Sequence, residues 1–134
     1  MVALATCSYQ EFREDMGQPV RISLGVPKFP LSWELPSSCL WELTPRGHYF
    51  HDPPDVFAEK YLAQLDRYGP ARLHEIFTAL ATGEAPLVAL CFERNVKSAA
   101  DCHRRLWAAF WFERTGEYVP ELGGMYADQG TEED

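Results

Sequence analysis

The stretch that decides the fold spans residues 86–114, PLVALCFERNVKSAADCHRRLWAAFWFER. Its first part, residues 87–92, is a short apolar run without polar alternation, which begins after Pro86 and ends at a polar turn. A run of this kind is typical of a strand that is covered on both faces, as in a parallel sheet flanked by helices. We therefore predict a buried parallel strand here, with Cys91 and Glu93 at its carboxyl end.

A helix is predicted to follow this strand. Ser98 is a suitable N-cap and Asp101, three residues later, completes a capping box, so the helix is expected to begin at Ala99. One apolar stripe runs along it at helical spacing and is formed by His103, Leu106, Trp107, Phe110 and Trp111. The stripe is expected to face the sheet, which makes the strand and the helix one packed unit.

The start of this helix carries several groups that are capable of chemistry. Helical periodicity places Cys102 and Arg104 at the rim of the apolar stripe. The same periodicity points Arg105 toward solvent. The first turn of a helix favours an anion and activates a thiol placed there, because its N–H groups are unpaired and carry a partial positive charge. Since ligands of open α/β sheets bind at the carboxyl edge, we predict a site where this turn meets the strand end.

The segment Ala89-Leu90-Cys91-Phe92-Glu93, followed after a short gap by Cys102-His103-Arg104, resembles the signature of the domain of unknown function 488 family. Residues 57–83 are also similar to the middle region of that family. The resemblance implies a Rossmann-like α/β fold and a small bacterial or phage protein, and it supplies no reaction. Where many members carry Asp-x-Arg before a basic-Phe-Pro, this chain departs from the pattern and reads Gly25-Val26-Pro27-Lys28-Phe29-Pro30.

The remaining elements are read from alternation, caps and breakers. We expect further strands over residues 2–7, 20–24, 40–43 and 118–122. Two helices are expected between them, one that begins after Asp55 and ends at Gly69-Pro70, and one that begins at Ala71 and ends before Gly83. The interleaving of strands and helices predicts a layered α/β domain, a three-layer sandwich with a mostly parallel sheet of about four to five short strands.

Composition limits the architecture and the partners. The 134 residues, 46% of them hydrophobic, fit one domain over residues 1–122, followed by an acidic mobile tail over 123–134. A net charge of −8 argues against extensive contact with nucleic acid. The sequence shows no membrane span and no signal peptide, so we expect a cytoplasmic protein without membrane partners. In that compartment Cys7, Cys39, Cys91 and Cys102 are expected to be reduced.

We predict an enzyme-like domain that binds a small anionic ligand, a nucleotide or a phosphorylated compound, at the carboxyl edge of the sheet. The residues given to catalysis are Cys91, Glu93 and Cys102. Cys102 or Cys91 is expected to be the nucleophile or a polar wall of the pocket, and Glu93 to orient Arg104 or act as general base. The ligand is assigned to His103, Arg104 and, from the loop over residues 26–33, Lys28. Glu93 and Arg104 are expected to form a bidentate ion pair over the sheet edge.

Other interpretations remain open at this point. The same motif would serve as a structural staple in a non-catalytic module that binds a protein partner through its acidic surface, and redox sensing by the thiols is a third reading. His103 faces the predicted core, where a structural histidine is the usual case. We predict no cofactor and no metal, because zinc sites usually show paired short spacings that His48, His51 and the cysteines lack.

Overall fold

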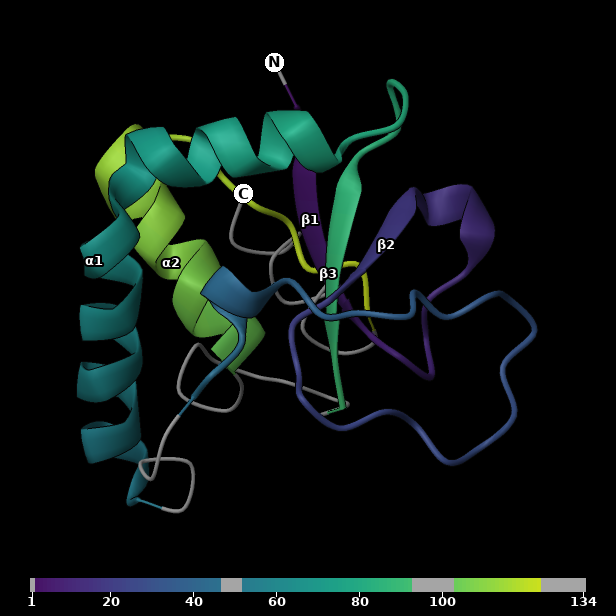
Figure 1. The fold of residues 1–134 in the computed structure, drawn as a ribbon, viewed down its shortest axis with the longest axis horizontal. Helices are drawn as coiled ribbons and strands as arrows, with labels where there is room; N and C mark the ends of the chain where they lie inside the picture. Colours follow the sequence, from purple (N-terminus) through teal and green to yellow (C-terminus); the bar gives the residue numbers. More distant parts are fainter. Residues whose placement is uncertain (1, 47–51, 93–102, 124–134) are drawn as a thin grey trace.

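The computed structural model describes residues 2–46, 52–92 and 103–123 (Figure 1). The elements are, in chain order, β1 (Leu4–Ser8), the 3-10 turn η1 (Glu14–Met16), β2 (Gln18–Arg21), the 3-10 turn η2 (Trp41–Leu43), α1 (Pro54–Leu80), β3 (Leu87–Cys91) and α2 (His103–Thr115). The described part is therefore a mixed α/β fold. None of its helices is both long and apolar enough to cross a membrane.

The three strands form one parallel sheet in the order β1-β3-β2. All five residues of the central strand β3 are buried, which confirms the predicted buried parallel strand. The prediction of four to five strands is wrong for the described residues. The segment over 40–43 closes into η2 through turn hydrogen bonds, and each edge of the sheet is extended by a single bridge, Thr6 to Glu121 on one side and Arg21 to Cys39 on the other.

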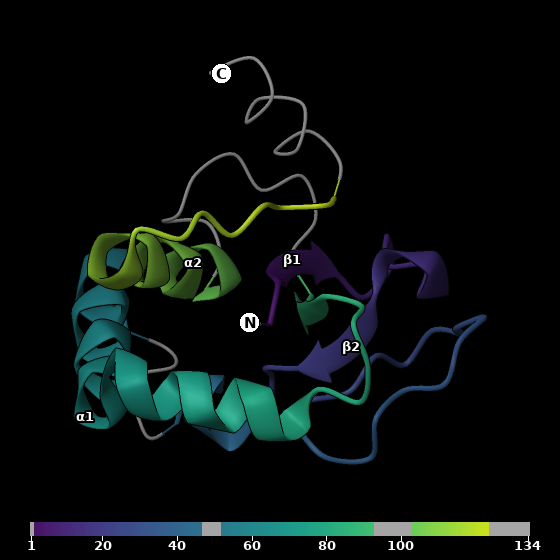
Figure 2. The ribbon, with the colours of Figure 1, turned by 90° about the horizontal axis from the view of Figure 1, so that it is seen from above.

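The helices α1 and α2 cover the same face of the sheet (Figure 2). That face presents Leu4, Val20, Leu87 and Ala89, which pack with the apolar side chains of both helices. The opposite face is covered by aromatic side chains of irregular segments, Tyr9, Phe12 and Trp33. Within the described chain the predicted arrangement of helices on both faces is therefore not found, because proline-rich loop residues take the place of a second helical layer.

The helix α1 changes direction in its middle, and Figure 1 shows its two halves pointing in different directions. Gly69 has φ 78° and ψ 159°, which is not helical, and Pro70 follows it. Proline cannot donate a backbone hydrogen bond, and its ring disfavours a helical residue before it. This confirms the predicted break at Gly69-Pro70. Both halves still reach the core, through Tyr61 and Leu65 before the break and Leu73 and Phe77 after it.

The helix α2 is buried over most of its circumference. The predicted apolar stripe is buried, but Arg104 and Arg105 are buried as well, at 1% and 4% exposure. The prediction that Arg105 faces solvent is thus wrong. After the helix ends at Gly116, which has φ 80°, the chain returns along β1, where Thr6 N–H donates to Pro120 O (2.9 Å). This returning segment covers the side of α2 that periodicity alone assigns to water.

Candidate functional site

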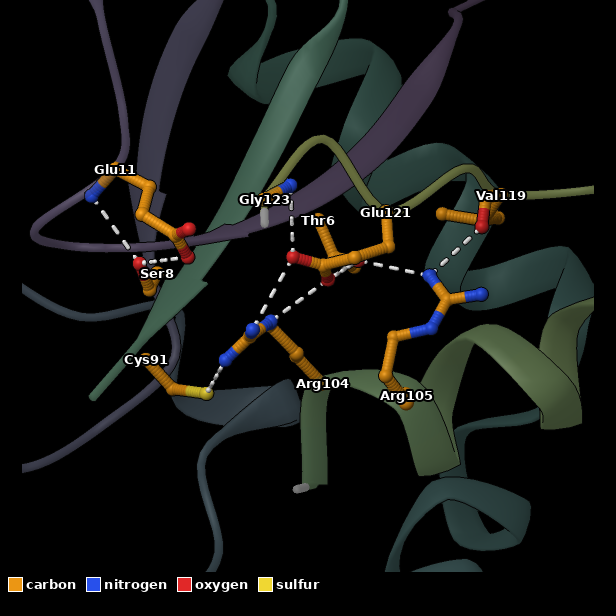
Figure 3. A network of polar contacts seen from close by, with 9 residues as sticks. All are labelled: Thr6, Ser8, Glu11, Cys91, Arg104, Arg105, Val119, Glu121 and Gly123. Carbon is orange, nitrogen blue, oxygen red and sulfur yellow. Dashed lines mark hydrogen bonds and ion pairs between the residues drawn. The ribbon is translucent and has the colours of Figure 1, made fainter. Parts of the chain in front are cut away.

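A buried ion pair lies where α2 meets the carboxyl ends of β1 and β3 (Figure 3). Arg104 Nε donates to Glu121 Oε1 (2.8 Å), and Arg104 Nη2 donates to Glu121 Oε2 (3.1 Å). The two side chains are 1% and 0% exposed. This parallel two-point contact is the strong, directional form of an arginine–carboxylate bond. It fixes the start of α2 to the returning segment beside β1.

A second arginine extends this contact into a network. Arg105 Nη1 donates to Thr6 Oγ1 (2.8 Å) and to Val119 O (2.8 Å). The Thr6 hydroxyl in turn donates to Glu121 Oε1 (2.7 Å), and Gly123 N–H donates to Glu121 Oε2 (3.0 Å). Both carboxylate oxygens of Glu121 thus accept two hydrogen bonds each. A buried carboxylate that is satisfied in this way adds rigidity and fixes one arrangement of the elements.

Cys91 borders this network at the end of β3. Its sulfur accepts a hydrogen bond from Arg104 Nη1 (3.0 Å), and the side chain is fully buried. Cys91 takes part in a disulfide bond, whereas Cys7 and Cys39 are free. The expectation that all four cysteines are reduced is therefore wrong for Cys91. That expectation was drawn from the assumed compartment, and residue types alone do not show which sulfurs the fold brings into bonding distance.

His103 and Lys28 lie in different surroundings. His103 Nε2 lies 2.7 Å from Ile22 O, and burial lowers the pKa of the imidazole to about 4, so the ring is neutral near pH 7 and donates to that carbonyl. Lys28 is exposed on the loop after β2 and makes no hydrogen bond or ion pair with the Arg104 network in the described chain. Of the predicted site residues that the structure describes, it thus brings Cys91 and Arg104 into contact, whereas the His103 side chain bonds Ile22 O and Lys28 lies on the loop after β2.

Two of the predicted catalytic residues, Glu93 and Cys102, lie outside the described residues, and so does the predicted start of α2 at Ala99. The predicted pair between Glu93 and Arg104 therefore stays a prediction. The carboxylate that the structure does place on Arg104 is Glu121, which the sequence reasoning missed. Its sequence signal is a single charged residue within Tyr118-Val119-Pro120-Glu121-Leu122, where an isolated charge between apolar neighbours calls for a buried partner.

A third buried arginine, Arg21, ends β2 at the same edge of the sheet and lies outside the Arg104 network. It is 6% exposed, and its Nη1 and Nη2 donate to the backbone oxygens of Pro36 (3.2 Å) and Leu24 (3.3 Å). Its Nε has no hydrogen-bond partner among the described residues. No carboxylate of the described chain forms an ion pair with Arg21, in contrast to Arg104. Within this part of the chain, no negative charge therefore balances the Arg21 guanidinium.

Arg21 lines a surface groove of about 480 Å³ that follows the outer edge of β2. The polar residues of the groove are Gln18, Arg21, Ser37, Ser38, Cys39 and Thr82. Two of them are bonded to each other, because Gln18 Oε1 accepts hydrogen bonds from Thr82 N–H (2.9 Å) and the Thr82 hydroxyl (3.1 Å). The groove therefore offers one cation and several hydroxyl groups, which are the donors that an oxyanion requires.

Tyr9 lies beside the same guanidinium on the loop-covered face. Its hydroxyl lies 2.7 Å from Ser23 Oγ, and Ser23 Oγ donates to Gly25 O (2.9 Å). Burial raises the pKa of Tyr9, while hydrogen bonding to Ser23 and the charge of Arg21 act in the opposite direction. Tyr9 is therefore a neutral phenol near pH 7, and it supplies no negative charge to balance Arg21.

Comparisons with known proteins add no assignment. No protein-family model matches the chain, and no curated protein or solved structure is significantly similar to it. Across the described residues, no three histidine, cysteine, aspartate or glutamate side chains are grouped so that they could hold a metal ion. The features that bear on function are therefore the Arg104–Arg105 network and the groove at Arg21.

Proposed function

We propose that this protein binds a small oxyanion, such as a phosphate ester, at the carboxyl end of β2, with Arg21 as the charged recognition group. The observation that carries the proposal is the buried guanidinium that no carboxylate of the described chain balances. The ligand class and the sheet edge are those predicted from the sequence. The residue that holds the charge is a different one.

The contrast between the two arginines supports this choice. The described partners of Arg104 are Glu121 and Cys91, so its charge is already compensated. The groups that Arg21 meets in the described chain are neutral, namely two backbone carbonyls and the Tyr9 phenol, and they orient the guanidinium without cancelling its charge. Removing a charge from water is costly unless an opposite charge or strong hydrogen bonds replace the lost hydration. An anion in the groove would supply that opposite charge and would be bound for this reason.

The chemistry of the groove fits a phosphate or a carboxylate. Guanidinium groups bind such anions through paired N–H donors, and hydroxyls such as those of Ser37 and Ser38 add neutral donors. The overall charge of −8 repels anions at long range. Binding must therefore come from local contacts, and this favours a small ligand over a polyanion such as nucleic acid.

We also propose membership of the domain of unknown function 488 family and a Rossmann-like fold. Both proposals rest on the sequence motif alone. They are compatible with a parallel sheet that carries its polar residues at the carboxyl edge. The Arg104 network acts in this proposal as a structural clamp between α2, β1 and β3. It holds the scaffold on which the groove is built.

The test is a titration of the isotope-labelled protein with inorganic phosphate, followed by amide chemical shifts. We expect saturable shifts for Ser37, Ser38 and Cys39, and none for the distant exposed pair between Asp66 and Arg114. An Arg21→Gln variant should lose the response.

The matched control is Arg72→Gln, which removes the same charge from an exposed position of α1 and should bind as the original protein does. Shifts that are absent at saturating phosphate in the unaltered protein would refute the proposal. So would equal binding by the Arg21→Gln and Arg72→Gln variants. If Arg21→Gln does not fold, the location of the shifts in the unaltered protein decides alone.

A further inference from the structure

We infer that Cys39 is a nucleophilic thiol of the Arg21 groove and reacts with anionic electrophiles that the guanidinium holds there. This inference rests on the proposed function, because it requires the anion to occupy the groove. It assigns to the site a substrate class, namely small carboxylates or phosphate esters that carry an electrophilic carbon near the charged group.

Cys39 lies beside Arg21 at the edge of the sheet. Arg21 and Cys39 are paired in the parallel bridge at the outer edge of β2, so the two residues are neighbours across the sheet edge. Both line the same groove. The bridge is held by Leu40 N–H, which donates to Arg21 O (2.6 Å). Side chains of paired residues emerge on the same face of a sheet, so the thiol and the guanidinium share one side of this edge.

The described cysteines differ in whether their sulfur is free and exposed. Cys7 is fully buried, and burial together with the charges of Glu121 and Glu11 raises its pKa to about 12, which keeps it a thiol. Cys91 is held in a disulfide. Cys39 is free and partly exposed on the groove wall. Among the cysteines that the structure describes, it alone is both free and reachable.

The Arg21 guanidinium indicates a ligand independently of the Cys39 thiol. A cysteine on a surface is common and carries no meaning by itself. Here it shares its groove with a guanidinium that is 6% exposed, whose Nε has no hydrogen-bond partner, and that no described carboxylate neutralises. A positive group beside a nucleophile raises the local concentration of anionic reactants. The thiol should therefore favour anionic over neutral electrophiles of equal intrinsic reactivity.

The reaction is a simple substitution. The sulfur of Cys39 donates an electron pair to the electrophilic carbon of the substrate, and an S–C bond forms. The bond from that carbon to its leaving group breaks, and the leaving group departs with the bonding pair. The thiol proton passes to water. No electron acceptor or donor is needed, so the step is balanced with the substrate alone.

The experiment compares alkylation by iodoacetate, which is anionic, with alkylation by iodoacetamide, which is neutral. The full chain is treated without reductant, and adducts are located by peptide mass spectrometry. We expect modification at Cys39, with an iodoacetate-to-iodoacetamide rate ratio about tenfold above that of an unstructured cysteine peptide. Inorganic phosphate should lower the iodoacetate rate more than the iodoacetamide rate, and a rise in sodium chloride should lower the ratio.

The variants separate the causes. Arg21→Gln should return the ratio to that of the peptide, Arg72→Gln should leave it raised, and Cys39→Ser should abolish the adduct. A ratio equal to that of the peptide while phosphate still shifts the groove amides would overturn this inference and leave the anion site intact. Absence of both signals would overturn both. If Arg21→Gln does not fold, the phosphate effect on the two rates in the unaltered protein decides.

Discussion

Replacement of Glu121 by glutamine should strongly destabilise the protein, although the two side chains have almost the same size. The amide keeps one oxygen as an acceptor but loses the negative charge, so the guanidinium of Arg104, 1% exposed, loses the carboxylate it contacts in two places. The amide nitrogen is a donor that would face Arg104 Nη2 or Gly123 N–H, which are donors themselves. The variant therefore has two costs, the loss of the negative charge and the contact between two hydrogen-bond donors.

The magnitude follows from burial. Breaking a buried ion pair on one side typically costs about 3–5 kcal/mol, because a charge remains without compensation. A domain of this size has a total unfolding free energy of about 5–15 kcal/mol, so Glu121→Gln should remove a large part of it. The melting temperature should fall by about 10–20 °C. Arg104→Met combined with Glu121→Gln should cost less than the sum of the two single changes, because no unpaired charge is left.

The measurement is urea unfolding followed by circular dichroism, with all variants compared without reductant. The matched control is Asp66→Asn, which breaks the exposed two-point pair between Asp66 and Arg114. That pair is solvated, so its loss should barely move the unfolding midpoint. If Glu121→Gln changes the unfolding free energy by less than about 1 kcal/mol, or no more than Asp66→Asn does, the clamp has no energetic role and the reasoning fails.

Three further outcomes are expected from the structure. Burial lowers the pKa of His103 to about 4, so between pH 6.5 and 4 the unfolded chain binds more protons than the folded chain. The unfolding free energy should therefore fall by up to about 3 kcal/mol as the pH drops through this range, and this contribution should stay level above pH 6.5. Urea titrations at several pH values should show this fall of the unfolding free energy in the unaltered protein. The fall should be absent from a His103→Gln variant measured in the same way. Gly17→Ala should cost more than Gly69→Ala in the same assay, because its Cβ would also lie 2.4 Å from Pro86 O. The Cβ of Gly69→Ala meets nothing within 4 Å, so its cost of about 1–3 kcal/mol should come only from backbone angles that are normally confined to glycine. Cys7, with its pKa raised to about 12 by burial, should not react with Ellman's reagent in the folded protein and should react after unfolding in urea; rapid labelling of Cys7 under native conditions would contradict its position in the core.

The sequence alone determined the local elements wherever the signal is local. The uninterrupted apolar run predicted β3, because a strand covered on both faces needs no polar alternation. Gly69-Pro70 predicted the break in α1, because these residue types impose or permit backbone angles that end a helix. The apolar stripe of α2 was also predicted, since it depends only on helical periodicity.

The tertiary structure decided which charges are buried and which sulfurs are bonded. Helical periodicity predicted that Arg105 faces solvent, because periodicity describes an isolated helix. In the structure the returning chain over residues 117–123 covers that side of α2. Arg104 meets Glu121, which lies 17 residues further along the chain and after the end of α2, so no local rule predicts the pair. The groove at Arg21 and Cys39 likewise forms between an edge strand and a loop. Such contacts are fixed by how the whole chain packs, and a pattern read along one segment carries no information on them.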